Sequence, residues 1–170
     1  MTSHAAPSRP SSTDLRRGSS SLLALLGYVA AVTVAAALGG VAASGSRETY
    51  QRLEQPPFAP PGWLFGPVWT VLYACIVIAG WLVWRRVGVD RSMVPYAVQL
   101  VLNAAWTPLF FAAGWYAAAL VEIVVLLVAI GVTIAMFARR SRAAALLLVP
   151  YAGWVAFATC LNAGIWWLNR

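Results

Sequence analysis

Long runs of apolar residues alternate with short polar segments along most of the chain. The runs cover residues 22–43, 63–84, 93–112, 115–137 and 143–168. A helix needs about 20 residues to cross the hydrocarbon core of a bilayer, and each run is close to that length. The strict alternation that is typical of membrane barrel strands does not occur in these runs. The pattern therefore predicts an all-α membrane protein, a five-transmembrane-helix bundle.

Composition supports the membrane interpretation and divides the chain into two parts. Of the 170 residues, 61% are hydrophobic and 10% are charged, whereas a soluble domain carries about 25% charged residues. We expect residues 21–170 to form the transmembrane domain, and residues 1–20, rich in Ser, Pro and Arg, to form a disordered tail. Alternatively, the tail and first run form a signal peptide that is cleaved near residues 41–43, although the run is long for such a peptide.

The charged residues predict an orientation in the membrane. All twelve basic residues are arginines, and the net charge is +7. They lie at the ends of apolar runs rather than on one helix face, so we expect no nucleic-acid partner. Nine of them lie in the tail or in residues 85–91 and 139–142, which the positive-inside rule places in the cytoplasm. We predict a cytoplasmic N-terminus, an external C-terminus and, because arginine and alanine are abundant and lysine is absent, a bacterial cell membrane.

The external segment before the second run combines prolines with aromatic residues. Five prolines occur in the twelve residues 56–67. Proline restricts the backbone and removes hydrogen-bond donors, so we expect a shaped lid over the bundle. The lid leads into a helix face that carries Phe65, Trp69 and Tyr73 at four-residue spacing.

Polar residues inside the runs predict two further inward faces. Gln99, Asn103 and Trp106 share one face of the third run. In the fifth run the corresponding face carries Trp154, Ala158, Leu161 and Asn162. The acid deep in a run is Glu122, which we expect to pair across the bundle or to contact a ligand. Each residue alone could serve packing, but together the faces predict a mostly apolar cavity for a flat ligand with polar edges.

Residues for conventional catalysis are missing from this pattern. The only histidine, His4, lies in the tail, and the two cysteines, Cys75 and Cys160, show no metal-binding spacing. No Ser/His/Asp set, phosphate loop or carboxylate pair occurs. We therefore predict no metal site and no required cofactor, and enzymatic activity stays uncertain.

Three motifs over about residues 25–169 resemble the TspO/MBR family, the tryptophan-rich sensory and translocator proteins also known as peripheral-type benzodiazepine receptors. The first is Pro56-x-x-x-Pro60-Pro61-x-Trp63 followed by Gly66-Pro67-Val68-Trp69-Thr70-x-Leu72-Tyr73. The second is Gln99-Leu100-x-Leu102-Asn103-x-x-Trp106 with Phe110-Phe111. The third is Pro150-Tyr151-x-x-Trp154-x-x-Phe157-Ala158-x-x-Leu161-Asn162.

The resemblance implies a five-helix bundle that forms a homodimer, with a ligand pocket capped by the loop after the first helix. It implies binding of protoporphyrin IX, haem and drug-like molecules, in contact with membrane lipid. The family's ligand-binding positions match Tyr50, Trp69, Tyr73, Asn103, Trp106, Glu122, Trp154 and Ala158. The helical spacing described above adds Phe65 to this predicted site.

Three functions stay open at this stage. A tetrapyrrole receptor or sensor is the interpretation that we favour. The alternatives are a light- and oxygen-dependent breakdown of porphyrin through Trp69 and Trp154, and transport of porphyrin or lipid. Thr49 and Phe58 stand where many members have tryptophan, which bears on photochemistry more than on binding. Strong sterol recognition is not expected, because Ala163 and Trp167 replace the two key residues of the animal cholesterol motif.

Overall fold

The computed structural model describes the backbone of residues 12–42 and 46–170 and the side chains of residues 21–37 and 48–170. Every regular element in that part of the chain is a helix, so the all-α prediction is confirmed. A 3₁₀ turn, Gly62–Leu64, precedes α3, and a π-helical turn, Pro108–Ala112, continues α4. The α-helices are α1 Ser12–Ala42, α2 Ser46–Arg52, α3 Phe65–Val87, α4 Met93–Thr107, α5 Tyr116–Ala138 and α6 Arg142–Leu168.

Four helical segments are long and apolar enough to cross a membrane. They cover Gly62–Val87, Met93–Ala112, Tyr116–Ala138 and Arg142–Leu168, close to the predicted second to fifth runs. In α1 the apolar segment with described side chains is shorter, Ser21–Ala37. The predicted count of five spans is therefore not confirmed. Large apolar side chains on the outside, such as Val71, Val101 and Val121, are more than 60% exposed, which suits a surface in contact with lipid.

The structure describes only part of the N-terminal segment that was predicted to be a tail. Helix α1 begins at Ser12, so the segment predicted as a disordered tail, residues 1–20, is helical in its second half. Residues 1–11 lie outside the described residues, and so does Ala43 of the alternative cleavage site. The boundary between tail and membrane domain stays a prediction.

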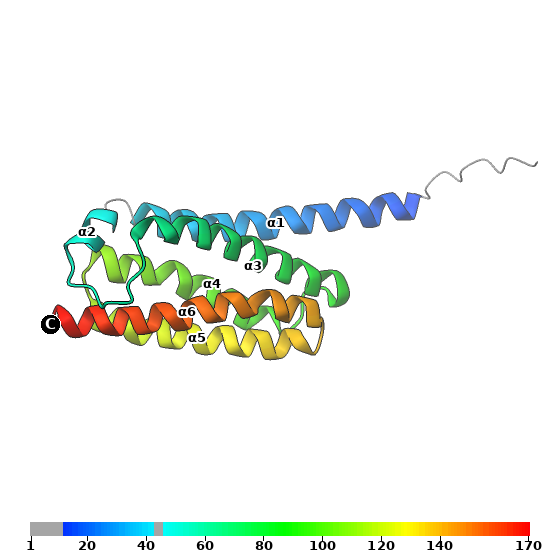
Figure 1. The fold of residues 1–170 in the computed structure, drawn as a ribbon. Coiled ribbons are helices and arrows are strands. Elements are labelled where there is room, and N and C mark those ends of the chain that lie inside the picture. The colour runs from blue at the N-terminus through cyan, green and yellow to red at the C-terminus, as the bar shows by residue number, and fades with distance from the viewer. Residues whose placement is uncertain (1–11, 43–45) are drawn as a thin grey trace, which may run out of the picture.

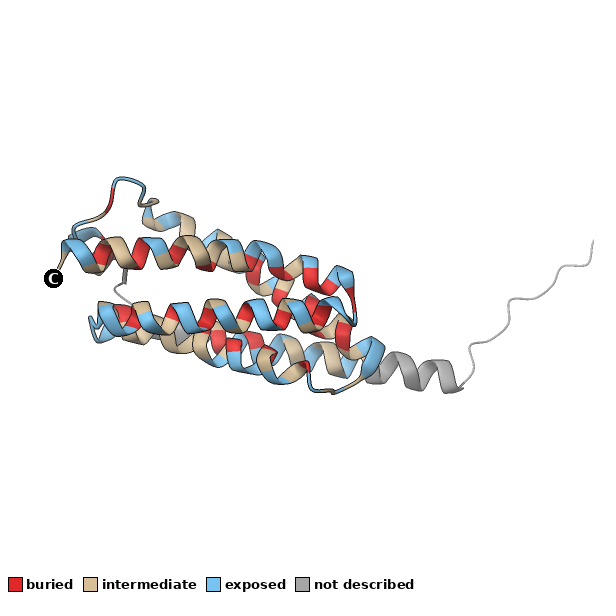
Figure 2. Cartoon of the chain, turned by 90° about the horizontal axis from the view of Figure 1, so that it is seen from below, coloured by how far each residue is buried: buried red, intermediate tan, exposed pale blue. Residues whose placement is uncertain are grey.

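The five long helices form a ring (Figure 1). Neighbouring pairs follow the order α1, α4, α5, α6, α3 and back to α1. Helices α3 and α4 follow each other in sequence but are not neighbours in the ring. Helix α1 lies between them on one side, and α5 and α6 lie between them on the other. Figure 2 shows buried residues along the inner faces of the helices and exposed residues along the outer faces. Side chains of α3 and α4 therefore meet across the interior of the ring.

Pro108 determines how α4 ends. Its ring removes a backbone N–H, so the regular bond to the preceding turn cannot form. The chain continues with wider turns, in which Ala113 N donates to Pro108 O at 2.9 Å and Trp115 N donates to Leu109 O at 3.0 Å. Gly114, with φ of +66°, reverses the chain towards α5, because glycine adopts this left-handed conformation without a steric penalty.

Two interhelical loops are joined at the end of the ring opposite the C-terminus. The Arg140 guanidinium contacts the Asp90 carboxylate at 2.9 Å, and Arg86 Nη1 donates to the Arg140 carbonyl at 2.9 Å. The hydroxyl and backbone N–H of Ser92, together with Arg140, hold the pKa of Asp90 below its usual range. The arginines of residues 85–91 and 139–142 therefore share one end of the molecule, as the charge pattern predicted.

Candidate functional site

A chain of hydrogen bonds crosses the interior of the ring. The Tyr73 hydroxyl on α3 donates to Asn103 Oδ1 on α4 at 3.0 Å. Asn103 Nδ2 in turn bonds the Tyr151 hydroxyl on α6 at 3.1 Å. Asn103 and Tyr151 are both buried. Because the amide acts as acceptor on one side and donor on the other, it fixes the relative positions of three helices.

Trp69 lies next to this hydrogen-bonded chain. Its ring centroid is 5.2 Å from that of Tyr73 and 6.1 Å from that of Tyr151. Both distances lie in the range of favourable aromatic pairs. One predicted tryptophan therefore packs directly on the two phenols that Asn103 connects.

The second predicted tryptophan, Trp154, lies in an aromatic row near the lid. Its ring centroid is 5.8 Å from Phe65 and 5.5 Å from Phe157. Phe65 also meets Tyr50 of α2 at 5.4 Å. The Trp154 indole N–H is shielded from solvent and has no hydrogen-bond partner among the described residues. A buried donor without a partner is uncommon in proteins and is available to a ligand.

Trp106 joins the π-helical turn to α6. Its indole N–H donates to Asn162 Oδ1 at 3.1 Å, and Asn162 Nδ2 donates to the Tyr116 carbonyl at 2.9 Å. Its ring stacks on Phe110 with centroids 4.9 Å apart. Asn162 therefore links Trp106 both to α6 and to the first turn of α5.

Glu122 on α5 does not form the predicted pair across the bundle. Both of its carboxylate oxygens are shielded from solvent, and neither has a hydrogen-bond partner in the described part of the chain. Gln99 on α4 is 1% exposed, and its amide atoms are likewise without described partners. Contact with the polar group of a ligand, the other expectation for Glu122, stays a prediction.

The lid is the segment of residues 53–61 between α2 and the 3₁₀ turn, and it is anchored by Tyr50. Its hydroxyl donates to the Pro60 carbonyl at 3.1 Å. Burial raises the pKa of the Tyr50 phenol, so the group stays protonated and remains a donor at neutral pH. The side chain therefore connects the lid with Phe65 at the start of α3.

The structure gathers most of the predicted site residues. Two apolar clusters that both include Trp106 contain Tyr50, Phe65, Trp69, Tyr73, Trp154 and Ala158, and hydrogen bonds attach Asn103. Tyr151, Phe157 and Asn162 contact Asn103, Trp154 and Trp106 directly but were not in the predicted ligand-binding set, although Asn162 was placed on the inward face of the fifth run. A sequence signal existed for two of them, since Tyr151 and Asn162 lie on the same helical face as Trp154 and Ala158.

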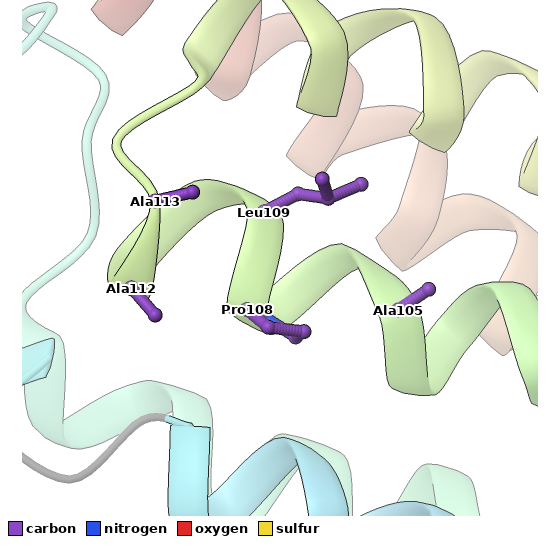
Figure 3. A pocket seen from close by; sticks show the side chains of 5 residues that line it. All are labelled: Ala105, Pro108, Leu109, Ala112 and Ala113. Atoms are coloured by element: carbon purple, nitrogen blue, oxygen red, sulfur yellow. The ribbon is translucent and has the colours of Figure 1, made fainter.

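A separate hollow lies beside the π-helical turn (Figure 3). Its lining is apolar and consists of Ala105, Pro108, Leu109, Ala112 and Ala113. None of the predicted site residues lines it. The hollow is shallow and open and has no aromatic lining, whereas Trp154 has Phe65 and Phe157 as ring neighbours.

Comparison with known proteins gives a consistent result. The model of the TspO/MBR family matches residues 28–168. The tryptophan-rich protein TspO of Chlorobaculum tepidum is 44% identical over 124 residues, which are 71% of this chain and 78% of the relative. The protein of that name from Archaeoglobus fulgidus is 39% identical over 151 residues, 87% of this chain and 98% of its own length. The human translocator protein is 39% identical over 122 residues, 69% and 72% of the two chains. With a family model that matches most of its length, the chain belongs to the TspO/MBR family.

Proposed function

We propose that this protein is an integral membrane receptor or sensor that binds tetrapyrroles, such as protoporphyrin IX and haem, and other flat apolar ligands. The observation that carries the proposal is the row of aromatic rings from Tyr50 through Phe65 to Trp154, beside the Asn103 hydrogen bonds. Flat apolar ligands are held by such rings, and a few placed polar groups determine their orientation. Relatives named tryptophan-rich sensory protein and translocator protein agree with this role.

The polar groups of the site suit the polar edge of a tetrapyrrole. The Trp154 N–H has no described partner and would donate to a propionate or carbonyl oxygen of the ligand. The Tyr73 and Tyr151 hydroxyls are already engaged with Asn103, so their role is to hold the aromatic faces in position. The apolar ring system of the ligand would then lie against Phe65, where it is shielded from water.

In the membrane, we propose that α1 acts as a fifth span beside the four clear ones. It packs against α3 and α4, and its segment Ser21–Ala37 is apolar. A helix in that position would close the ring towards lipid. The N-terminus would then lie in the cytoplasm with the arginine-rich loops, and the C-terminus and lid would lie outside.

The test of ligand binding is a titration of the purified protein in detergent with protoporphyrin IX in the dark. The change in the absorption spectrum of the porphyrin is followed, so that loss of a tryptophan does not alter the signal. Saturable binding is expected for the wild-type protein, and Trp154→Ala and Asn103→Leu should weaken it. Trp115→Ala is the matched control, since Trp115 is 63% exposed and belongs to no predicted face. Equal affinity in all four proteins contradicts the proposed site.

A light-driven breakdown of the bound porphyrin is the second candidate. The position of Trp69 against Tyr73 and Tyr151 favours it, since indole and phenol rings can give up an electron to an excited ligand or to an oxidant. The complex is illuminated in air, and the loss of porphyrin is compared between wild type and the double variant Trp69→Phe, Trp154→Phe. Retained binding with slower loss supports the mechanism, whereas equal rates remove the two tryptophans from it.

A further inference from the structure

Asn169, the C-cap of α6, joins the lid to the end of that helix by hydrogen bonds. Asn169 Oδ1 accepts from the backbone N–H of Glu54 at 3.0 Å, and Nδ2 donates to the Glu54 carbonyl at 2.9 Å. The same Nδ2 group donates to the Ile165 carbonyl at 2.8 Å. The amide therefore binds both backbone groups of one lid residue while it caps its own helix, and this uses its full set of donors.

Apolar contacts support the lid at two further points of the same helix. The buried ring of Pro56 lies over Gly164, so that a Cβ atom on Gly164 would come within 3.0 Å of Pro56 Cγ. Phe58 meets Phe157 edge to face with centroids 6.3 Å apart. Helix α6 and its C-cap thus contact the lid at Phe157, Gly164 and Asn169, over about three helical turns. A larger residue at position 164 would displace the lid.

The same helix also carries the tryptophan of the proposed site. Trp154 contacts Phe157 at 5.5 Å, and Phe157 contacts Phe58 of the lid. One face of α6 therefore runs from the proposed ligand site to the lid. A ligand that leaves past the lid must break the contacts with this face.

We propose that Asn169 is a positioning residue that keeps the lid closed and thereby limits the release of ligand from the site. This inference rests on the proposed ligand-binding function. The Asn169 contacts with Glu54 lie at the surface, so water can replace them and the lid can open without unfolding the bundle. Opening also breaks the apolar contacts of Pro56 with Gly164 and of Phe58 with Phe157. Because opening costs these contacts, the closed state is the more stable one.

The first experiment measures lid opening without a ligand. Backbone hydrogen exchange of the lid amides, those of Leu53, Glu54, Gln55, Phe58 and Ala59, is compared in wild type, Asn169→Ala and Arg170→Ala in detergent. Arg170 is the matched control, because it neighbours Asn169 and stacks on Trp167 rather than on the lid. Exchange in the lid should become about fivefold faster in Asn169→Ala, because both solvent-exposed hydrogen bonds between Asn169 and Glu54 are lost. Exchange in α5 should not change, which separates lid opening from general unfolding. Unchanged lid exchange in Asn169→Ala overturns the proposal.

The second experiment locks the lid. The double substitution Pro56→Cys, Gly164→Cys is made in a background with Cys75→Ala and Cys160→Ala, since both native thiols are free. A Cβ on residue 164 would lie 3.3 Å from the Cβ of residue 56, close to the separation in a disulfide of about 3.5–4.5 Å. The substitution also removes the proline ring atoms that approach Gly164. The oxidised protein holds the lid in its closed position.

Release of protoporphyrin IX is then followed after mixing the complex with excess apoprotein of a haem carrier. Release should be about fivefold faster in Asn169→Ala than in wild type or Arg170→Ala. It should slow at least tenfold in the oxidised double-cysteine protein and recover after reduction. Equal release from the oxidised and reduced forms overturns the gating role. If wild type fails to bind protoporphyrin IX, the proposed function and the gating role fail together, and lid exchange alone decides whether Asn169 holds the lid.

Discussion

Helices α1 and α4 approach α3 closely at Gly80, and Gly80→Ala tests this packing. A Cβ atom at this position would lie 2.7 Å from Cζ and from the hydroxyl of Tyr96 on α4, and 2.9 Å from Cε1 of Tyr28 on α1. All three distances are shorter than a carbon contact can be, so Tyr96 must move. Its hydroxyl donates to the Ile76 carbonyl at 2.9 Å, and its ring stacks on Phe137 at 5.6 Å. Movement of the ring weakens both contacts.

The size of the effect follows from these contacts. Insertion of an extra methyl group into a packed core costs about 1–3 kcal/mol. Loss of the Tyr96 hydrogen bond adds about 1 kcal/mol. The greater helix propensity of alanine offsets about 1 kcal/mol of this cost. We expect Gly80→Ala to lower the free energy of unfolding by about 1–3 kcal/mol and the Tm by about 3–10 °C.

The assay is thermal unfolding in detergent, with Gly131→Ala as the matched control. Gly131 also lies inside an apolar helix, but a Cβ there would have nothing within 4 Å. It should leave the Tm unchanged or raise it slightly, because only helix propensity changes. If Gly80→Ala unfolds at the same temperature as Gly131→Ala, then α1, α3 and α4 do not meet at Gly80 in the way that the structure describes.

Three further predictions concern the site and the loops. Ala158→Leu should fill space beside Trp154 and weaken protoporphyrin IX binding by roughly tenfold, or ~1.4 kcal/mol, and a titration with unchanged affinity would exclude Ala158 from the site. Asn162→Leu should lower the free energy of unfolding by about 2 kcal/mol, because it leaves the partly buried Trp106 indole N–H and Tyr116 carbonyl without their partner; a wild-type melting curve contradicts this. The pKa of Asp90 is lowered by its Ser92 and Arg140 contacts, so stability should fall with acidification through that lowered pKa. Asp90→Asn should show a flatter pH profile of Tm, and identical profiles would refute the contribution.

The helices could be located from the sequence because each apolar run is long enough to cross a bilayer. In lipid the backbone must satisfy its own hydrogen bonds, so a run of this length has few alternatives to a helix. Burial confirms the inward direction of Gln99, Asn103 and Ala158, since helical periodicity determines which residues share a face. The end of α4 at Pro108 follows from the missing N–H of proline.

Contacts between helices could not be predicted in this way. Periodicity tells which face of a helix points inward, but not which helix it meets. Glu122 shows this limit, because the sequence predicted either a partner across the bundle or a ligand contact, and its carboxylate has no hydrogen-bond partner among the described residues. Phe157 shows it again, since it meets the lid through Phe58, 99 residues before it in the chain.

The sequence by itself determined an all-α membrane protein, the positions of four clear spans and the faces that carry the aromatic and amide residues. These properties depend on length, hydropathy and periodicity, which are local. Only the tertiary structure decided that α3 and α4 face each other across the ring, and therefore that Asn103 joins Tyr73 to Tyr151. It alone decided that Asn169 holds Glu54, 115 residues away in the chain. These long-range pairs of side chains depend on the order of the helices in the ring. That order is selected by the packing of whole helix faces and not by any local sequence preference.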